Sequence, residues 1–147
     1  MPEGPASLLD RGLLVPWYVL HRLDEEMERS RRRGHQLAIV VLQAVPLLDQ
    51  LPNLQQTLQV GAAAAREASR VSDLIGWLGT DRILIVLPDT DKDGAASAVW
   101  RWRENMRMRS WHLGTVRWNV AALFNATSFT TVDELLESAR VELRPAA

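Results

Sequence analysis

A turn that carries a carboxylate and a guanidinium separates two short apolar runs in the segment LIGWLGTDRILIVLP, positions 74–88. Gly79, Thr80, Asp81 and Arg82 form the polar part, which is the pattern of a β-hairpin loop. The aspartate could bind a divalent cation, because hard cations such as Mg²⁺ prefer carboxylate oxygens. Glycine and aspartate are also common turn residues, so the residues alone favour a structural role for Asp81.

A second charged pair lies just before this hairpin, in the segment RVSD at positions 70–73. Arg70 and Asp73 are three positions apart, between the predicted end of a helix and the first hairpin strand. A pair with this spacing often forms only a local salt bridge or a cap. Arginine can also bind a phosphate or a base edge through two parallel hydrogen bonds, so a binding role is open as well.

The composition excludes several other chemistries. The chain has no cysteine, which rules out disulfides, thiolate catalysis and thiolate metal sites. His21, His35 and His112 lack the spacing of metal ligands and are expected at the surface or its boundary. The net charge is −1, and the longest apolar stretch, LAIVVLQAVPLL, is too short to span a bilayer. No signal peptide opens the chain, so we expect a cytoplasmic protein without membrane insertion.

The segment WRWRENMRMRSWH, positions 100–112, interleaves arginines with aromatic residues as some nucleic-acid-binding surfaces do. At helical spacing, however, Trp102 and Met106 fall on the apolar stripe, while Arg101, Arg103 and Arg107 fall largely off it. We therefore favour a solvated basic face and expect no nucleic-acid partner. Trp100 is off the stripe, and an exposed tryptophan is typical of an interface.

The periodicity predicts eight elements in the order helix, strand, helix, strand, strand, helix, strand, helix. This order predicts an α+β fold with a mixed, mainly antiparallel sheet and a β-α-β-β-α-β core flanked by helices. We expect a flexible lead-in over residues 1–12 and one domain over residues 13–147. The four helices are expected over about 13–33, 53–71, 94–109 and from 131 onward, and the strands over 36–43, 74–78, 83–88 and 114–124. Gly34 is expected to end the first helix, and Thr131 or Thr130 to cap the last, with Glu134 in the capping-box position relative to Thr131.

The ordered motifs resemble a GGDEF domain, the nucleotidyl-cyclase palm-like fold that condenses two GTP molecules into cyclic di-GMP. The segment RRRGHQLAIVVLQ resembles the family's basic helix end and first strand, and VDELLESARVEL resembles its closing helix. The long segment from Arg66 to Asn105 resembles the R-x-x-D motif, the GGDEF hairpin and the helix that follows. The resemblance covers nearly all of the chain.

This resemblance places the signature turn on Gly79, Thr80, Asp81, Arg82 and Ile83. In the family, two glycines let the backbone approach the substrate, and acids hold divalent cations on the triphosphate. Here Thr80 adds a side chain and Arg82 inverts the charge. The family's metal-binding aspartate on the first strand falls on Gln43, and its guanine-and-metal loop has become QAVPLLDQLPN, where only Asp49 or Asn53 could substitute. The resemblance therefore implies a domain that is not an enzyme and has no metal or cofactor.

The family's product-binding residues are retained. Arg70 and Asp73 match its R-x-x-D inhibitory site, and Arg101 matches a further arginine that assists this site. The resemblance thus implies a degenerate bacterial GGDEF domain that binds cyclic di-GMP through Arg70, Asp73 and Arg101 and catalyses nothing. Trp17 and Trp77 are expected to fill the emptied substrate cleft.

The alternative function is a pseudo-enzyme scaffold without nucleotide binding, which would pair as a homodimer or with a protein partner. It predicts an exposed apolar patch around Trp100 or Trp111.

Overall fold

The computed structural model describes residues 8–46, 54–109 and 116–146, and all structural statements below concern these residues. Asp49, Asn53, Trp111 and His112, which the sequence analysis singled out, lie outside them. The elements are β1 (Leu9–Asp10), β2 (Leu13–Leu14), α1 (Pro16–Arg33), β3 (Leu37–Pro46), α2 (Leu54–Ala68), β4 (Leu74–Leu78), β5 (Arg82–Pro88), α3 (Lys92–Arg109), β6 (Val116–Leu123), a 3₁₀ helix (Ala126–Ser128), α4 (Val132–Glu142) and β7 (Arg144–Pro145).

The strands form one mixed sheet in the order β1-β2-β4-β5-β3-β6-β7. Its four main strands pair antiparallel: β3 lies between β5 and β6, and β4 and β5 form the predicted hairpin. Of the paired strands, β2 and β4 run parallel. The predicted α+β class and the β-α-β-β-α-β core, here β3-α2-β4-β5-α3-β6, are confirmed.

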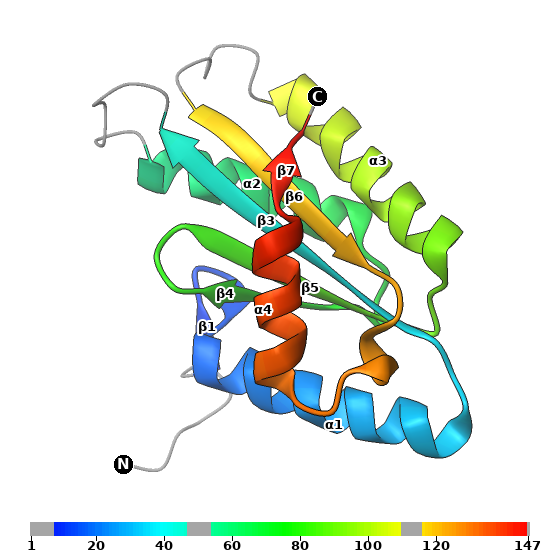
Figure 1. The fold of residues 1–147 in the computed structure, drawn as a ribbon. Helices are drawn as coiled ribbons and strands as arrows, with labels where there is room; N and C mark the ends of the chain where they lie inside the picture. The colour runs from blue at the N-terminus through cyan, green and yellow to red at the C-terminus, as the bar shows by residue number, and fades with distance from the viewer. Residues whose placement is uncertain (1–7, 47–53, 110–115, 147) are drawn as a thin grey trace, which may run out of the picture.

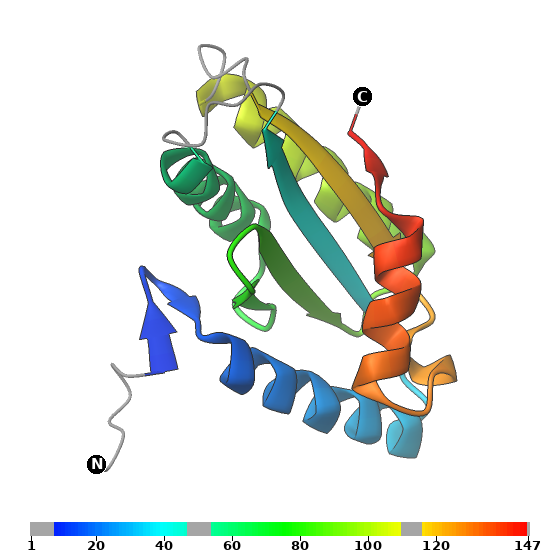
Figure 2. The same cartoon turned by 60° about the vertical axis from the view of Figure 1, so that its left-hand side comes forward.

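Helices cover both faces of this sheet (Figures 1 and 2). Helices α2 and α3 pack against one face, and α1 and α4 against the other. The central strand β3 is buried on both faces from Leu37 to Leu42, as its continuous run of β-branched and apolar residues predicts. The alternation of side chains along β3 therefore divides the core in two, with Ala38, Val40 and Leu42 facing α2 and α3 and Leu37, Ile39 and Val41 facing α1 and α4.

The first helix begins at Pro16, not at Leu13 as the sequence predicted. Proline suits the first helical position, because its φ is already helical and the missing N–H would have no partner there. Leu13 and Leu14 instead form β2, where Leu14 pairs with Gly76 of β4. In front of them, Leu9–Asp10 of the expected lead-in form β1 and pair with β2.

Helix ends elsewhere also differ by a few residues. Helix α2 ends at Ala68 rather than near Val71. Helix α3 begins at Lys92 rather than Gly94, because Oδ1 of Asp91 accepts a hydrogen bond from the Gly94 amide at 2.8 Å and caps the first turn.

Two predicted helix signals are confirmed. Gly34 ends α1 in the left-handed conformation, with φ +67°. Thr131 caps α4 by accepting a hydrogen bond from the Glu134 amide at 3.2 Å. The Glu134 carboxylate reaches back to the amide of Thr130, one residue earlier than a capping box on Thr131 requires.

None of the helices in the described parts of the chain is both long enough and apolar enough to cross a membrane.

Candidate functional site

The three predicted binding residues line one hollow of about 280 Å³ at the ends of α2, β5 and the start of α3. Arg70 and Asp73 come from the α2–β4 connection, and Arg101 comes from the third turn of α3. The remaining lining residues are Gln36, Leu87, Asp89, Thr90, Asp91, Gly94, Ser97 and Ala98. The structure therefore brings together the three predicted residues, although Arg70 and Arg101 lie about thirty positions apart in the sequence.

The Arg70 guanidinium is held from two sides. Its Nη2 donates to Oδ1 of Asp73 at 3.0 Å, and its Nε lies 3.5 Å from Oδ2 of the same carboxylate. Nη2 also lies 2.8 Å from the Pro88 carbonyl and 2.7 Å from the Thr90 hydroxyl, so its two protons are shared among three acceptors. Arg70 thus ties the α2–β4 connection to the end of β5, while half of its side chain stays exposed.

Asp73 is enclosed by these contacts. Its side chain is 0 % exposed, and Oδ2 also accepts a hydrogen bond from the backbone amide of Arg70 at 2.8 Å. The local salt bridge that the sequence left open is therefore present, and it lies within the wall of the hollow.

Arg101 is held by the end of α2. Its Nε and Nη2 both donate to the Ala68 carbonyl at 3.2 Å, which is one of the last carbonyls of that helix and lacks an intrahelical partner. Its Nη1 donates to the hydroxyl of Ser97, one turn earlier on α3, at 2.8 Å. Arg101 is half-buried and lines the hollow, so the expectation that it lies on a solvated basic face with the other arginines of α3 is wrong.

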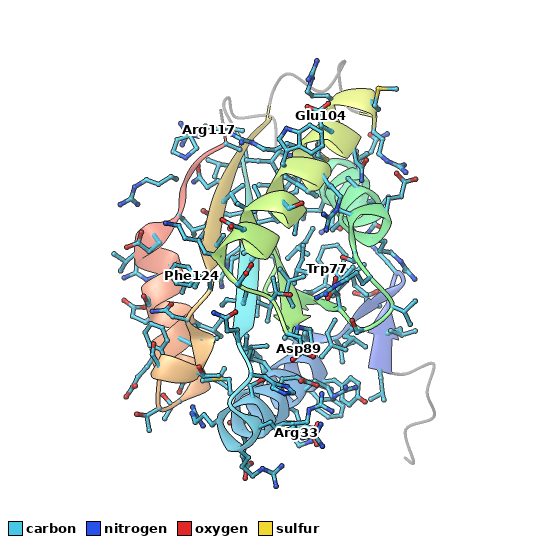
Figure 3. All side chains as sticks on the ribbon, turned by 90° about the vertical axis from the view of Figure 1, so that its right-hand side faces the viewer. Arg33, Trp77, Asp89, Glu104, Arg117 and Phe124 are labelled. Atoms are coloured by element: carbon cyan, nitrogen blue, oxygen red, sulfur yellow. The ribbon has the colours of Figure 1, made fainter. Side chains whose placement is uncertain are left out.

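Carboxylates also line this hollow. Asp89 lies between the start of α3 and the α1 helix that carries Arg33 (Figure 3). Its backbone has φ +51°, which aspartate tolerates better than most residues, and its Oδ1 lies 2.8 Å from Nδ1 of His35. The Asp91 carboxylate accepts a hydrogen bond from the Gly94 amide and so caps α3. An anionic ligand would therefore meet two arginines beside carboxylates that already have protein partners.

The signature turn, residues 79–83, carries one carboxylate and one guanidinium and differs in this from the hollow around Arg70. Gly79 takes φ +71°, which suits glycine, and the turn is one residue shorter than predicted because β5 begins at Arg82. Asp81 does not point to a second acid. Its Oδ2 accepts a hydrogen bond from the Gln43 side-chain amide at 3.2 Å, and the Asn119 amide donates to Oε1 of Gln43 at 3.3 Å.

Arg82 lies on the other side of this carboxylate, with Nε 3.5 Å from Oδ1 of Asp81. Ile83 is fully buried, and Thr80 is exposed. Within the described residues, no three histidine, aspartate or glutamate side chains are grouped so that they could hold a metal ion. The one carboxylate of the turn is bound by an amide and a guanidinium, so these residues do not fit the divalent cations of the GGDEF family.

A small hollow of about 200 Å³ lies beside the turn, with Trp77 in its wall. Trp77 is buried, and its indole N–H donates to the Asp10 carbonyl of β1 at 2.9 Å. The expectation that Trp17 also fills this region is wrong, because Trp17 is 55 % exposed and packs edge-on against Tyr18. Trp17 comes directly after Pro16 at the helix start, where the apolar stripe of α1 has not yet begun.

Sequence reasoning missed the groups that hold the two arginines. These are the hydroxyls of Thr90 and Ser97 and the carbonyls of Pro88 and Ala68. The carbonyls carry no side-chain signal, and the hydroxyls become partners only when α3 and β5 meet the end of α2.

No protein-family model matches the chain, and no curated protein matches it significantly in sequence. Solved structures do match it. The diguanylate cyclase SiaD of Pseudomonas aeruginosa, solved in complex with its activator SiaC, superposes with a TM-score of 0.74 at 25 % identity over 93 % of this chain. A diguanylate cyclase protein of Thermotoga maritima gives 0.75 at 13 % identity, covering 90 % of this chain and 96 % of that one.

The GGDEF domain of DgcB from Caulobacter crescentus, solved in complex with cyclic di-GMP, gives a TM-score of 0.71 at 13 % identity, covering 96 % of this chain and 87 % of that one. The chain spans 56 % of the SiaD chain that it matches. The fold and these similarities show that the chain is a GGDEF-like domain with an α+β fold.

Proposed function

We propose that this GGDEF-like domain is a receptor for cyclic di-GMP that has no cyclase activity. The observation that carries the proposal is the convergence of Arg70, Asp73 and Arg101 on one hollow. Two guanidinium groups there can bind the phosphates and the guanine edges of a cyclic dinucleotide through paired hydrogen bonds. The DgcB structure, a similar fold in complex with cyclic di-GMP, supports this ligand class.

Arg70 retains a donor for such a ligand. The hydrogen bonds of Arg70 to the described residues run through Nε and Nη2, which leaves Nη1 for a ligand. Half of the Arg70 side chain is exposed, so a ligand can reach it. Because protein carbonyls and hydroxyls already orient both arginines, little side-chain entropy is lost when a ligand binds.

The absence of cyclase activity rests on the signature turn. Catalysis by this family would require carboxylates that gather divalent cations on a triphosphate. Here Gln43 and Arg82 contact the carboxylate of Asp81, and Arg82 would repel a cation. Incubation with GTP and either Mg²⁺ or Mn²⁺ should yield no cyclic di-GMP. A product that disappears in Asp81→Ala would contradict this part of the proposal.

Isothermal titration calorimetry with cyclic di-GMP tests the receptor function. We expect binding to the wild-type chain and its loss in Arg70→Ala, because this change removes the guanidinium and leaves Asp73 without its partner. Arg107→Ala is the matched control, since Arg107 is an exposed arginine of α3 that pairs with Glu104 outside the hollow. The control should bind as the wild type does.

The absence of heat and of any thermal shift at a ligand concentration of about 100 μM would exclude a useful receptor, since a ligand well above its Kd should raise stability by about 2–3 kcal/mol. Equal loss of binding in Arg70→Ala and Arg107→Ala would place the ligand elsewhere on the basic surface of α3.

The alternative function, a protein-interaction scaffold, is favoured by one observation. Trp100 is 61 % exposed on α3, and tryptophan is one of the residues enriched at the centres of protein interfaces. SiaD, of which this chain matches 56 %, was solved in complex with its activator SiaC, which supports a protein partner as the alternative. Light scattering should then detect a homodimer that Trp100→Ala weakens, and a monomer at all concentrations would argue against self-association.

A further inference from the structure

We propose that Thr90 and Asp73 together fix the Arg70 guanidinium for an anionic ligand, so that the Asp73 carboxylate holds the arginine and does not contact the ligand. The ligand part of this inference rests on the proposed receptor function. It assigns a role to Thr90, which neither the motif nor its spacing singles out, and it changes the role that the resemblance implies for Asp73.

The position of the Thr90 hydroxyl supports its role in fixing the Arg70 guanidinium. Thr90 is 6 % exposed and lies between β5 and α3. Its hydroxyl accepts from Nη2 of Arg70 at 2.7 Å and lies 2.9 Å from the Pro88 carbonyl, to which it can donate its own proton. A hydroxyl has one proton to donate. When that proton is donated to the Pro88 carbonyl, the oxygen lone pairs of Thr90 can accept the hydrogen bond from the Arg70 guanidinium.

The burial of Asp73 supports the inference that its carboxylate holds Arg70 and does not contact the ligand. Both carboxylate oxygens of Asp73 already accept hydrogen bonds from Arg70, from the side chain and the backbone amide, and the side chain is 0 % exposed. A ligand could reach this carboxylate only by displacing Arg70. The carboxylate and the hydroxyl therefore hold the guanidinium on its Nε and Nη2 side, which leaves Nη1 for a ligand.

Arg101 shows the same arrangement within the same hollow. The Ser97 hydroxyl accepts from its Nη1, and the Ala68 carbonyl accepts from Nε and Nη2. Each arginine thus contacts one hydroxyl group and one protein carbonyl, and Arg70 contacts the Asp73 carboxylate in addition. Fixing flexible side chains before binding reduces the entropy lost on binding, so removal of a holding group should weaken affinity without altering the contacting atoms.

The first test requires no ligand. In ¹⁵N–¹H spectra, we expect slow rotation about the Nε–Cζ bond of Arg70 and separate Nη1 and Nη2 signals in the wild type. Thr90→Val removes the hydroxyl at nearly constant volume and should speed this rotation, whereas Thr90→Ser should restore it. Thr127→Val, a threonine of the 3₁₀ helix away from the hollow, is the matched control. Unchanged Arg70 signals in Thr90→Val would overturn the assignment of Thr90.

The second test is calorimetry with cyclic di-GMP and cyclic di-AMP. Thr90→Val should bind cyclic di-GMP roughly tenfold more weakly than the wild type, the size of effect expected for one hydrogen bond to a charged group, and Thr90→Ser should bind nearly as well as the wild type. Asp73→Asn should weaken both dinucleotides by similar factors if the carboxylate acts through Arg70. A loss confined to cyclic di-GMP would show that Asp73 contacts the guanine and would overturn that part.

The two tests separate the two proposals. If the wild type binds neither dinucleotide but Arg70 is fixed by Thr90 in the spectra, the receptor function fails and the positioning role of Thr90 stands. If the wild type binds and Thr90→Val binds equally well, the receptor function stands and the positioning role fails.

Discussion

The side-chain amide nitrogen of Gln43 lies 3.2 Å from Oδ2 of Asp81, so an amide on the central strand holds the carboxylate of the signature turn. The Asn119 amide continues this chain from β6, and Arg82 places a positive charge on the opposite side of the carboxylate. The carboxylate of the turn is therefore contacted by an amide on one side and by a guanidinium on the other. This contact is the observation on which the proposed absence of cyclase activity rests.

Gln43→Glu should make this network unstable. The change replaces a donor by a second carboxylate at the position that contacts Asp81, so a hydrogen bond is lost and two like charges meet. We expect the free energy of unfolding at neutral pH to fall by about 1–3 kcal/mol. Chemical denaturation of the variant and the wild type measures this difference, and equal stabilities would contradict the importance of the Gln43–Asp81 contact.

The same variant should respond to pH and to cations. Mutual repulsion raises the pKa of the paired carboxyls, so the destabilisation should be present at neutral pH and should diminish as the pH falls and one carboxyl is protonated. Mn²⁺ should raise the Tm of Gln43→Glu but not of the wild type, because two carboxylates can share a cation. The double variant with Asp81→Asn is the control and should lose both responses.

Arg101→Ala should separate stability from binding. The guanidinium caps the end of α2 through the Ala68 carbonyl, so its removal should lower the free energy of unfolding by about 1 kcal/mol. The affinity for cyclic di-GMP should fall more steeply, by roughly tenfold or more, if Arg101 contacts a phosphate. Denaturation and calorimetry on one preparation give the free energy of unfolding and the affinity. A stable variant with unchanged affinity would show that Arg101 does not contact the ligand.

Gly61→Ala should destabilise the fold although alanine is the better helix former. A Cβ at this position of α2 would lie 2.4 Å from Cη2 of Trp118, which packs edge-on against Trp102 at 5.2 Å between ring centroids. Alanine gains at most about 1 kcal/mol in helix propensity, whereas overpacking costs about 1–3 kcal/mol, so the Tm should fall. The double variant with Trp118→Phe should recover part of the loss, and a higher Tm in Gly61→Ala alone would contradict this packing.

Glu137 should titrate below its ordinary value of 4.5, because the Arg140 guanidinium donates two hydrogen bonds to it and lowers the pKa of its carboxyl. A depressed pKa contributes stability above the ordinary pKa, and this contribution is lost as the pH falls through the folded value. Arg140→Gln should return the midpoint of Glu137 toward 4.5, as ¹³C NMR of the carboxyl can measure. The Tm should change little, since both side chains are exposed.

Much of the fold could be predicted because the main signals are local. The β-branched run of β3, the hairpin loop at Gly79 and the helix stop at Gly34 each depend on neighbouring residues, and all three are confirmed. The N-terminal strands β1 and β2 could not be predicted, because two-residue strands have no periodicity and form only where β4 offers an edge.

The candidate site, like the fold, could be predicted only in part. Arg70, Asp73 and Arg101 could be placed together through the resemblance, since its motifs fix their spacing relative to the hairpin and α3. The contact of Arg70 with Thr90 and Pro88 could not, because it joins two segments that meet only through the pairing of β4 and β5. Sequence reasoning therefore found the arginines and missed what orients them.

The measurement that tests the central claim most directly is a calorimetric titration of the wild-type chain and Arg70→Ala with cyclic di-GMP. The receptor function predicts saturable heat for the wild type and none for the variant, with Arg107→Ala behaving as the wild type. A flat titration of a folded wild-type chain would contradict it.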